Sequence, residues 1–237
     1  MSSAAPQIGF DRFIHRDCVA AALRVRAGTS DMQHLNELLD SAHIGDAARK
    51  KTRTVLNRLW LEPRSDLTEF ADRGVKILRD SPNTSITILS WGMAIVTYPF
   101  FGKVAEIVGR LTSLQGDCAS AEIHRRMSET FGEREGTRRM TNMVLQSQAS
   151  WGVIERVNNG KRILRKPTIE VAGEPTVVWL VEACVRYSGR PISLASIEAM
   201  PVIFPFRIID RLAHALAMAP TLEVRSVGIN NQVVDMK

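Results

Sequence analysis

Apolar residues recur at the spacing of helical turns through the first hundred positions of the chain. This pattern predicts four helices, over residues 11–30, 30–39, 45–61 and 66–79. Ser30 is a residue type that caps helices, and Pro63 is expected to end the third helix. Helices joined by short loops in this way predict an N-terminal helical bundle over residues 1–100.

Residues 81–102 carry no charge and approach the length of a membrane span. The first third of this segment is rich in Ser, Pro, Asn and Thr, and Pro99 interrupts its far end. No cluster of Lys and Arg flanks it, as a cytoplasmic anchor would. We therefore expect a fifth helix buried inside the bundle, and no association of the protein with a membrane.

The pattern changes after Pro99. Helical spacing predicts three further helices, over residues 103–114, 120–131 and 135–150. Apolar residues then mark two strands, at 153–157 and 163–164. The sequence Asn158-Asn159-Gly160 between them tolerates the positive φ of a tight hairpin. Three helices followed by a hairpin are typical of a winged helix-turn-helix unit, which we expect over residues 101–170.

The remaining residues, 171–237, repeat this order. The pattern predicts an apolar helix over residues 176–187, a short helix after Ser193, a third helix over residues 206–218, and a hairpin around residues 228–231. The predicted fold class is therefore mainly α. It consists of an N-terminal helical bundle followed by tandem winged helix-turn-helix-like units with small β-hairpin wings.

The positive charge of the chain is unevenly distributed. The formal net charge is +6, in a composition of 45% hydrophobic and 24% charged residues that is typical of globular proteins. Residues 119–166 contain ten Lys and Arg against five Asp and Glu, so nearly all of the surplus falls in the first winged unit. Concentrated Lys and Arg gain affinity for duplex DNA by releasing its condensed counterions. The charge distribution therefore favours a nucleic-acid partner.

The helix over residues 135–150 is the candidate recognition helix, because the early turns of such a helix enter the major groove. Arg pairs with guanine and Asn with adenine, while Thr suits a phosphate or a thymine methyl group. The predicted DNA-binding residues are Arg125, Arg126, Arg134, Thr137, Arg138, Arg139, Thr141, Asn142, Asn158, Asn159, Lys161, Arg162, Arg165 and Lys166. Against this stands the alternative that arginine-rich helix faces are merely solvated. The clustering on both helix and wing favours DNA binding.

Enzyme motifs are missing from the sequence. It contains no HExxH, no GxSxG and no glycine-rich nucleotide loop after a strand. The histidines stand without carboxylate or cysteine neighbours, and His124 is only a secondary candidate for a DNA contact. Cys18, Cys118 and Cys184 lie too far apart for a metal site or a disulfide framework. Cys118 precedes a helix, a position that can lower a thiol pKa. We expect a non-enzymatic cytoplasmic protein with no cofactor and no metal.

Two segments, YPFFGKVAEIVGRLTSLQG and FGEREGTRRMTNMVLQSQASWGVIE, resemble the BrxA family of bacterial BREX phage-defence systems. The features that carry the resemblance are Tyr98-Pro99-Phe100-Phe101 at the start of a helix, the Gly132-Glu133-Arg134 turn, Trp151-Gly152 before the wing, and Gly228 with Val233-Val234 in the closing hairpin. Members of that family were long described as inner-membrane proteins. The resemblance implies instead a small, helical, DNA-binding accessory protein.

The sequence thus predicts a non-enzymatic protein that binds double-stranded DNA as an accessory component of a BREX-like phage-defence system. Its expected partners are double-stranded DNA and other defence-system proteins, and a homo-oligomer stays open. Two alternatives remain at this point. The winged helices of a scaffold would contact partner proteins, and a transcriptional regulator would prefer one operator. RNA also stays open as a ligand, although few aromatic residues for stacking on single strands accompany the basic ones.

Overall fold

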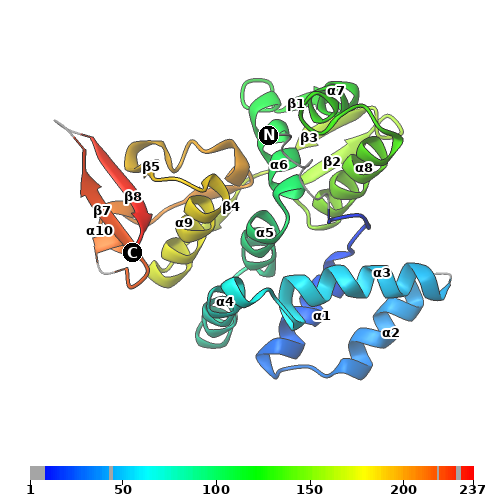
Figure 1. Ribbon diagram of the computed structural model, residues 1–237, viewed down its shortest axis with the longest axis horizontal. Helices are drawn as coiled ribbons and strands as arrows, with labels where there is room; N and C mark the ends of the chain where they lie inside the picture. The colour runs from blue at the N-terminus through cyan, green and yellow to red at the C-terminus, as the bar shows by residue number, and fades with distance from the viewer. Residues whose placement is uncertain (1–8, 43–44, 218, 228–230) are drawn as a thin grey trace, which may run out of the picture.

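The structure is a computed structural model that describes residues 9–42, 45–217, 219–227 and 231–237 (Figure 1). Within these residues the fold is mainly helical, with ten α-helices and three small sheets, which confirms the predicted class. The N-terminal elements are α1 (Arg16–Ala27), α2 (Met32–Ala42), α3 (Asp46–Leu56), the π-helical turn η1 (Asn57–Leu61), the 3-10 turn η2 (Ser65–Leu67) and α4 (Thr68–Asp80). All four predicted N-terminal helices are present, with ends shifted by a few residues.

Helix α1 lies at the centre of this bundle and packs on α2, η1, α4 and α5. Three consecutive alanines, at positions 20–22, are buried in α1, and their small side chains let neighbouring helices approach closely. Gly28 ends the helix with a φ of 71°, a left-handed conformation that glycine adopts without steric cost. The guanidinium of Arg26 donates to the Trp60 carbonyl at 2.8 Å and to Asp72 at 2.7 Å, so it fastens α1 to two other elements.

The uncharged segment forms α5 (Ile86–Thr97), whose residues 87–97 are all buried. Pro99 then begins α6 (Pro99–Leu111), and the two helices bend by 117° at the junction. Proline suits this position because the first amide of a helix has no partner within the helix. In the part of the chain that the structure describes, no single helix combines the length and apolar character needed to cross a membrane, and only this bent pair reaches both when taken together.

The first predicted winged unit begins with α6 and continues through β1 (Asp117–Ala119), α7 (Ser120–Phe131), α8 (Glu135–Ser150), β2 (Ile154–Val157) and β3 (Arg162–Arg165). The strands form an antiparallel sheet in the order β1-β3-β2. The sequence pattern predicted both helices and the hairpin but not β1. This strand of three residues exists because Cys118 pairs with Ile163, far along the chain.

The C-terminal part contains β4 (Ile169–Val171), α9 (Glu174–Ser188), β5 (Ile192–Ser193), η3 (Leu194–Ser196), η4 (Pro201–Ile203), β6 (Phe206–Ile208), α10 (Leu212–Ala217), β7 (Leu222–Ser226) and β8 (Gln232–Met236). The order β5-β8-β7 repeats that of the first sheet. Two predictions need correction. The short helix after Ser193 is a single 3-10 turn, and residues 206–208 are a strand rather than the start of a helix. The tip of the last hairpin, residues 228–230, lies outside the described residues.

One apolar core runs through all three predicted segments. Helix α5 packs on α9, and α6 packs on η4, so the bundle and the C-terminal part share an interface. Glycines make this approach possible: a Cβ atom on Gly92 would lie 2.3 Å from Trp179, and one on Gly109 would lie 2.1 Å from the Pro201 carbonyl oxygen. The predicted divisions at residues 100 and 170 therefore cross a continuous core.

Candidate nucleic-acid interface

Helix α8 exposes a narrow stripe of polar side chains. Arg138 and Arg139 are exposed, and Asn142 and Gln146 are half-buried at the following turns. At 100° per residue these four positions fall within about one third of the helix circumference. The opposite face carries Val144 and Gln148, which are fully buried. The stripe combines two guanidiniums and two carboxamides on one straight helix, which are the groups that pair with base edges.

Two of the predicted contacts on this helix are wrong. Thr137 is 1% exposed and Thr141 is fully buried, where its hydroxyl donates to the Thr137 carbonyl at 2.8 Å. Both threonines lie on the core side of α8 and cannot reach a phosphate. Their positions four residues apart placed them together on one face, and the sequence did not show that this face points inward.

Gln146 belongs to the exposed stripe, although it was not among the predicted residues. It stands four residues after Asn142, so helical periodicity alone would have included it. Arg134 lies just before α8 as its N-terminal cap residue, is exposed, and extends the basic end of the stripe.

A second group of nitrogen atoms gathers where α7, α8 and β2 meet. His124 and Arg156 are half-buried there, and the Nδ1 atom of His124 and the Nε atom of Arg156 are buried without a hydrogen-bond partner in the described residues. Burial lowers the pKa of His124, and the nearby guanidiniums of Arg138 and Arg156 lower it further, while a hydrogen bond with Asn142 acts in the opposite direction. Neither residue was a primary prediction. Of the two, only Arg156 adds positive charge beside the stripe, because the lowered pKa disfavours the charged form of His124.

The hairpin between β2 and β3 presents its turn to solvent. Asn158 and Asn159 have φ values of 52° and 55°, which confirms the predicted left-handed turn, and both are exposed. Gly160 has a φ of 79°, and a Cβ atom there would lie 2.7 Å from the Arg156 guanidinium, so this side chain rests on the turn. Lys161 and Lys166 are exposed and make no ion pair within the described residues.

The other two wing arginines are occupied. The Nε atom of Arg162 donates to the Asp117 carboxylate at 2.9 Å. Arg165 is half-buried, donates to the Phe204 carbonyl and stacks its guanidinium 5.5 Å from the Phe204 ring. Burial also lowers the pKa of Arg165. We therefore remove Arg165 from the candidate contacts, because it fastens the wing to the C-terminal part of the chain.

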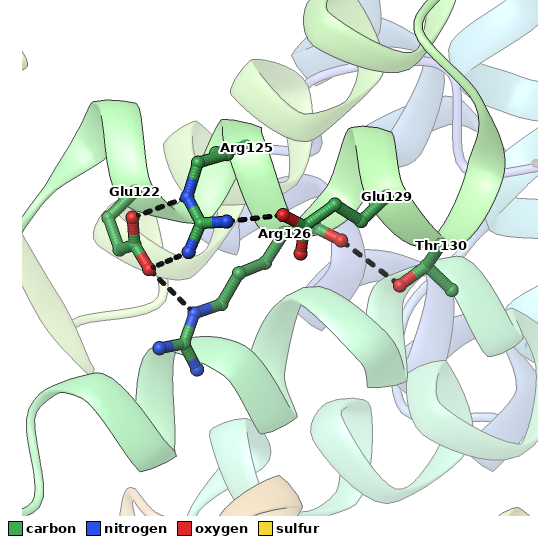
Figure 2. Close-up of polar contacts among 5 residues, drawn as sticks. All are labelled: Glu122, Arg125, Arg126, Glu129 and Thr130. Atoms are coloured by element: carbon green, nitrogen blue, oxygen red, sulfur yellow. Dashed lines mark hydrogen bonds and ion pairs between the residues drawn. The ribbon is translucent and has the colours of Figure 1, made fainter.

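The two predicted arginines on α7 are also held by acids (Figure 2). Arg125 donates to Glu122 at 2.7 and 2.9 Å and also to Glu129, and Arg126 donates to Glu122 at 2.8 Å. These hydrogen bonds lower the pKa of Glu122 to about 2. The two carboxylates balance the two guanidiniums, so α7 carries no formal net charge. Apart from Arg165, which is held by Phe204, the cations left without an ion pair in the described part of this unit are Arg134, Arg138, Arg139, Arg156, Lys161 and Lys166.

The stripe is supported from behind by side chains that fix α8. The indole of Trp151, just after α8, donates to the Ile14 carbonyl at 3.0 Å, and the hydroxyl of Thr87 in α5 donates to the Trp151 carbonyl at 3.2 Å. Trp151 itself is 2% exposed and lies against Trp91 and Phe101. A surface helix fixed by buried aromatic residues holds its exposed side chains in a constant arrangement.

The C-terminal part offers a different surface. Arg207 pairs with Glu170, His214 lies 3.1 Å from Glu174, and Arg225 pairs with both Glu223 and Asp235. Although its strands repeat the order of the first sheet, its cations are balanced by acids. This part shows no counterpart of the α8 stripe within the residues described.

No group of three or more His, Cys, Asp and Glu side chains lies close enough to hold a metal ion, among the residues that the structure describes. The three cysteines are buried, and burial raises the pKa of Cys18 and Cys118 to about 11 and that of Cys184 to about 12. The expectation that Cys118 has a lowered pKa is wrong, because desolvation outweighs its position before α7.

The chain matches no known protein family, no curated protein and no solved structure.

Proposed function

We propose that residues 99–166 form a winged helix that binds double-stranded DNA, with α8 in the major groove and the β2–β3 turn on the adjacent backbone. The observation that carries this proposal is the stripe of Arg138, Arg139, Asn142 and Gln146 on a helix whose opposite face is buried. The order of elements, with a β1-β3-β2 sheet after two helices, supports it. The major groove of DNA admits one α-helix, and α8, at 16 residues, is long enough to cross it.

Each part of this surface has a distinct role in the proposal. Arg138 and Arg139 reach guanine edges or phosphates, and the carboxamides of Asn142 and Gln146 read adenine. Lys161 and Lys166 contact the phosphate backbone beside the groove and add affinity without sequence preference. The predicted contacts from Arg125, Arg126 and Arg162 are secondary, because each must first leave a carboxylate.

Duplex binding by the triple variant Arg138→Ala/Arg139→Ala/Lys161→Ala tests the proposal. We expect its affinity to fall at least tenfold at moderate salt and the slope of log K against log salt to shrink by about 3, since about 0.9 is lost per phosphate contact. Fluorescence anisotropy with a labelled duplex at several salt concentrations measures both quantities.

The matched control is Arg64→Ala/Arg207→Ala/Arg225→Ala, which removes the same charge from exposed arginines that are paired with acids elsewhere. It should change the affinity and the slope much less. Equal effects of the two triple variants would show that net charge, rather than the α8 surface, governs binding, and the proposal would be wrong.

We further propose that the protein acts in a BREX-like phage-defence system as a DNA-binding component without catalysis of its own. The resemblance of the segments around Tyr98 and Trp151 to the BrxA family supports this context. In cells that carry such a system, the α8 triple variant should lose protection, measured as phage plating efficiency, and the control triple variant should keep it. Full protection by both variants would show that protection does not depend on DNA binding through α8.

A further inference from the structure

The last turn of α8 lacks a cation of its own. The basic residues of the helix stand near its start, and no basic residue lies in its last turn. The C-terminal end of a helix carries the negative end of its dipole, which repels a phosphate. A helix that crosses the major groove brings both ends close to phosphates of opposite strands, so its C-terminal end needs a positive group from elsewhere.

The N-terminal segment, residues 10–16, supplies such a group at this place. The Ile14 amide donates to the Ser147 hydroxyl at 2.9 Å, and the Arg16 amide donates to the Ser150 hydroxyl at 3.0 Å. The Trp151 indole donates to the Ile14 carbonyl. These three hydrogen bonds join the segment to the last turn of α8, and the fully buried Phe10 and Ile14 anchor it in the core.

Arg16 is exposed, and its side chain makes no ion pair within the described residues. The neighbouring carboxylate of Asp17 lies 3.4 Å from the His15 imidazole and does not pair with Arg16. Ser150, to which the Arg16 backbone is bonded, stands four residues after Gln146, at the edge of the exposed stripe. From Arg139 to Ser150 the helix rises about 17 Å, at about 1.5 Å per residue. This length exceeds the major-groove width of about 12 Å, so the two ends reach the two sides of the groove.

We infer that Arg16 is part of the DNA-binding surface and contacts a phosphate of the strand opposite to that bound by Arg138 and Arg139. This inference rests on the proposed function. In this arrangement α8 reads the groove, the arginines at its start bind one backbone, and the N-terminal segment binds the other. The surface is therefore built from two parts of the chain that are separated by 134 residues in sequence.

Substitution of Arg16 in the full chain tests this inference. Arg16→Ala should weaken duplex binding about three- to tenfold on every DNA sequence and reduce the salt slope by about 1, as expected for one lost phosphate contact. Arg16→Lys should restore most of the affinity, because a phosphate contact needs charge rather than the shape of a guanidinium. Fluorescence anisotropy with two unrelated duplexes measures these effects, and thermal unfolding checks that each variant is folded.

Arg24→Ala is the matched control, since Arg24 is exposed in the last turn of the same helix α1 and makes no ion pair in the described residues. Equal affinities of Arg16→Ala and Arg24→Ala, with a clear loss for Arg138→Ala/Arg139→Ala, would overturn the role of Arg16 and leave the proposed function standing. If every one of these variants kept the full affinity for DNA, both the role of Arg16 and the proposed function would be wrong.

Discussion

Arginines that look alike in the sequence differ in what surrounds them in the structure. Arg138 and Arg139 are exposed on α8 and pair with no acid among the residues that the structure describes, whereas Arg125 and Arg126 share the carboxylate of Glu122. Asp117, which pairs with Arg162, stands just outside the basic segment and escapes a count that begins at residue 119. Charge density along the chain therefore indicated the candidate surface but did not show which of its cations are paired with acids.

Glu122 restrains two arginines, so its neutralisation should strengthen DNA binding. In Glu122→Gln the hydrogen bonds that lower the pKa of this carboxyl to about 2 are weakened, so Arg126 becomes available to phosphates while Arg125 keeps Glu129. We expect affinity to rise several-fold and the salt slope to increase by about 1. Glu198→Gln removes the same charge from an exposed site without an ion pair in the described residues. An equal gain in that variant would contradict the release of Arg126.

Elements defined by their own sequence were predictable, and elements defined by distant partners were not. The predicted bounds of α8 agree with the structure, Glu135 to Ser150, because Gly132 before it and Gly152 after it flank its apolar periodicity. β1 escaped prediction because its three residues become a strand only by pairing with β3. Residues 206–208 looked helical, yet β6 forms there through a parallel pairing with β4. Tertiary pairing decided both cases, and single-sequence periodicity does not contain it.

The packing of α6 on η4 depends on a glycine. In Gly109→Ala the new Cβ atom would meet the backbone carbonyl of Pro201, which cannot rotate away as a side chain can. We expect a loss of about 1–3 kcal/mol in the free energy of unfolding, measured by urea denaturation. Gly136→Ala is the control, because its nearest neighbour, Met140 Cε, lies 4.0 Å away and alanine favours the helix. Unchanged stability of Gly109→Ala would mean that α6 and η4 do not approach this closely.

At the scale of the whole molecule, a continuous core joins the parts that the sequence divided into three domains. The sequence predicted the helical bundle and the first hairpin from local patterns. It did not predict that α5 packs on α9 or that residues 10–16 lie against α8, because these contacts join segments about a hundred residues apart. The charge of the candidate surface was predictable from the sequence, but the contacts that hold α8 in place became visible only in the structure.

Glu182 holds three parts of the molecule together. Its buried carboxylate accepts hydrogen bonds from Arg73 of α4 at 2.6 Å, Arg186 of α9 at 2.8 Å and Thr221, just before β7, at 2.7 Å. Glu182→Ala would leave two guanidiniums without their partner, and we expect a loss of about 3 kcal/mol or more in the free energy of unfolding. Urea denaturation measures it, and it should show one transition because the core is shared.

Glu174→Ala provides the comparison for this variant, since the Glu174 carboxylate is half-exposed and, in the described part of the chain, pairs with His214 alone. An exposed pair contributes below about 1 kcal/mol. A Glu182→Ala protein as stable as Glu174→Ala would show that the buried carboxylate does not join the three elements.

The attachment of residues 10–16 to α8 also bears on how the protein is made. The hydrogen bonds of this segment span 133 to 137 positions. During synthesis on the ribosome, Phe10 and Ile14 leave the exit tunnel long before Ser147 and Trp151. The apolar side chains of Phe10 and Ile14 therefore emerge before the residues that they contact in the folded protein. The proposed DNA-binding surface is therefore complete only after the chain has been made past Trp151. A nascent chain that stops before Trp151 therefore carries residues 10–16 without a complete α8, the helix to which this segment is hydrogen-bonded.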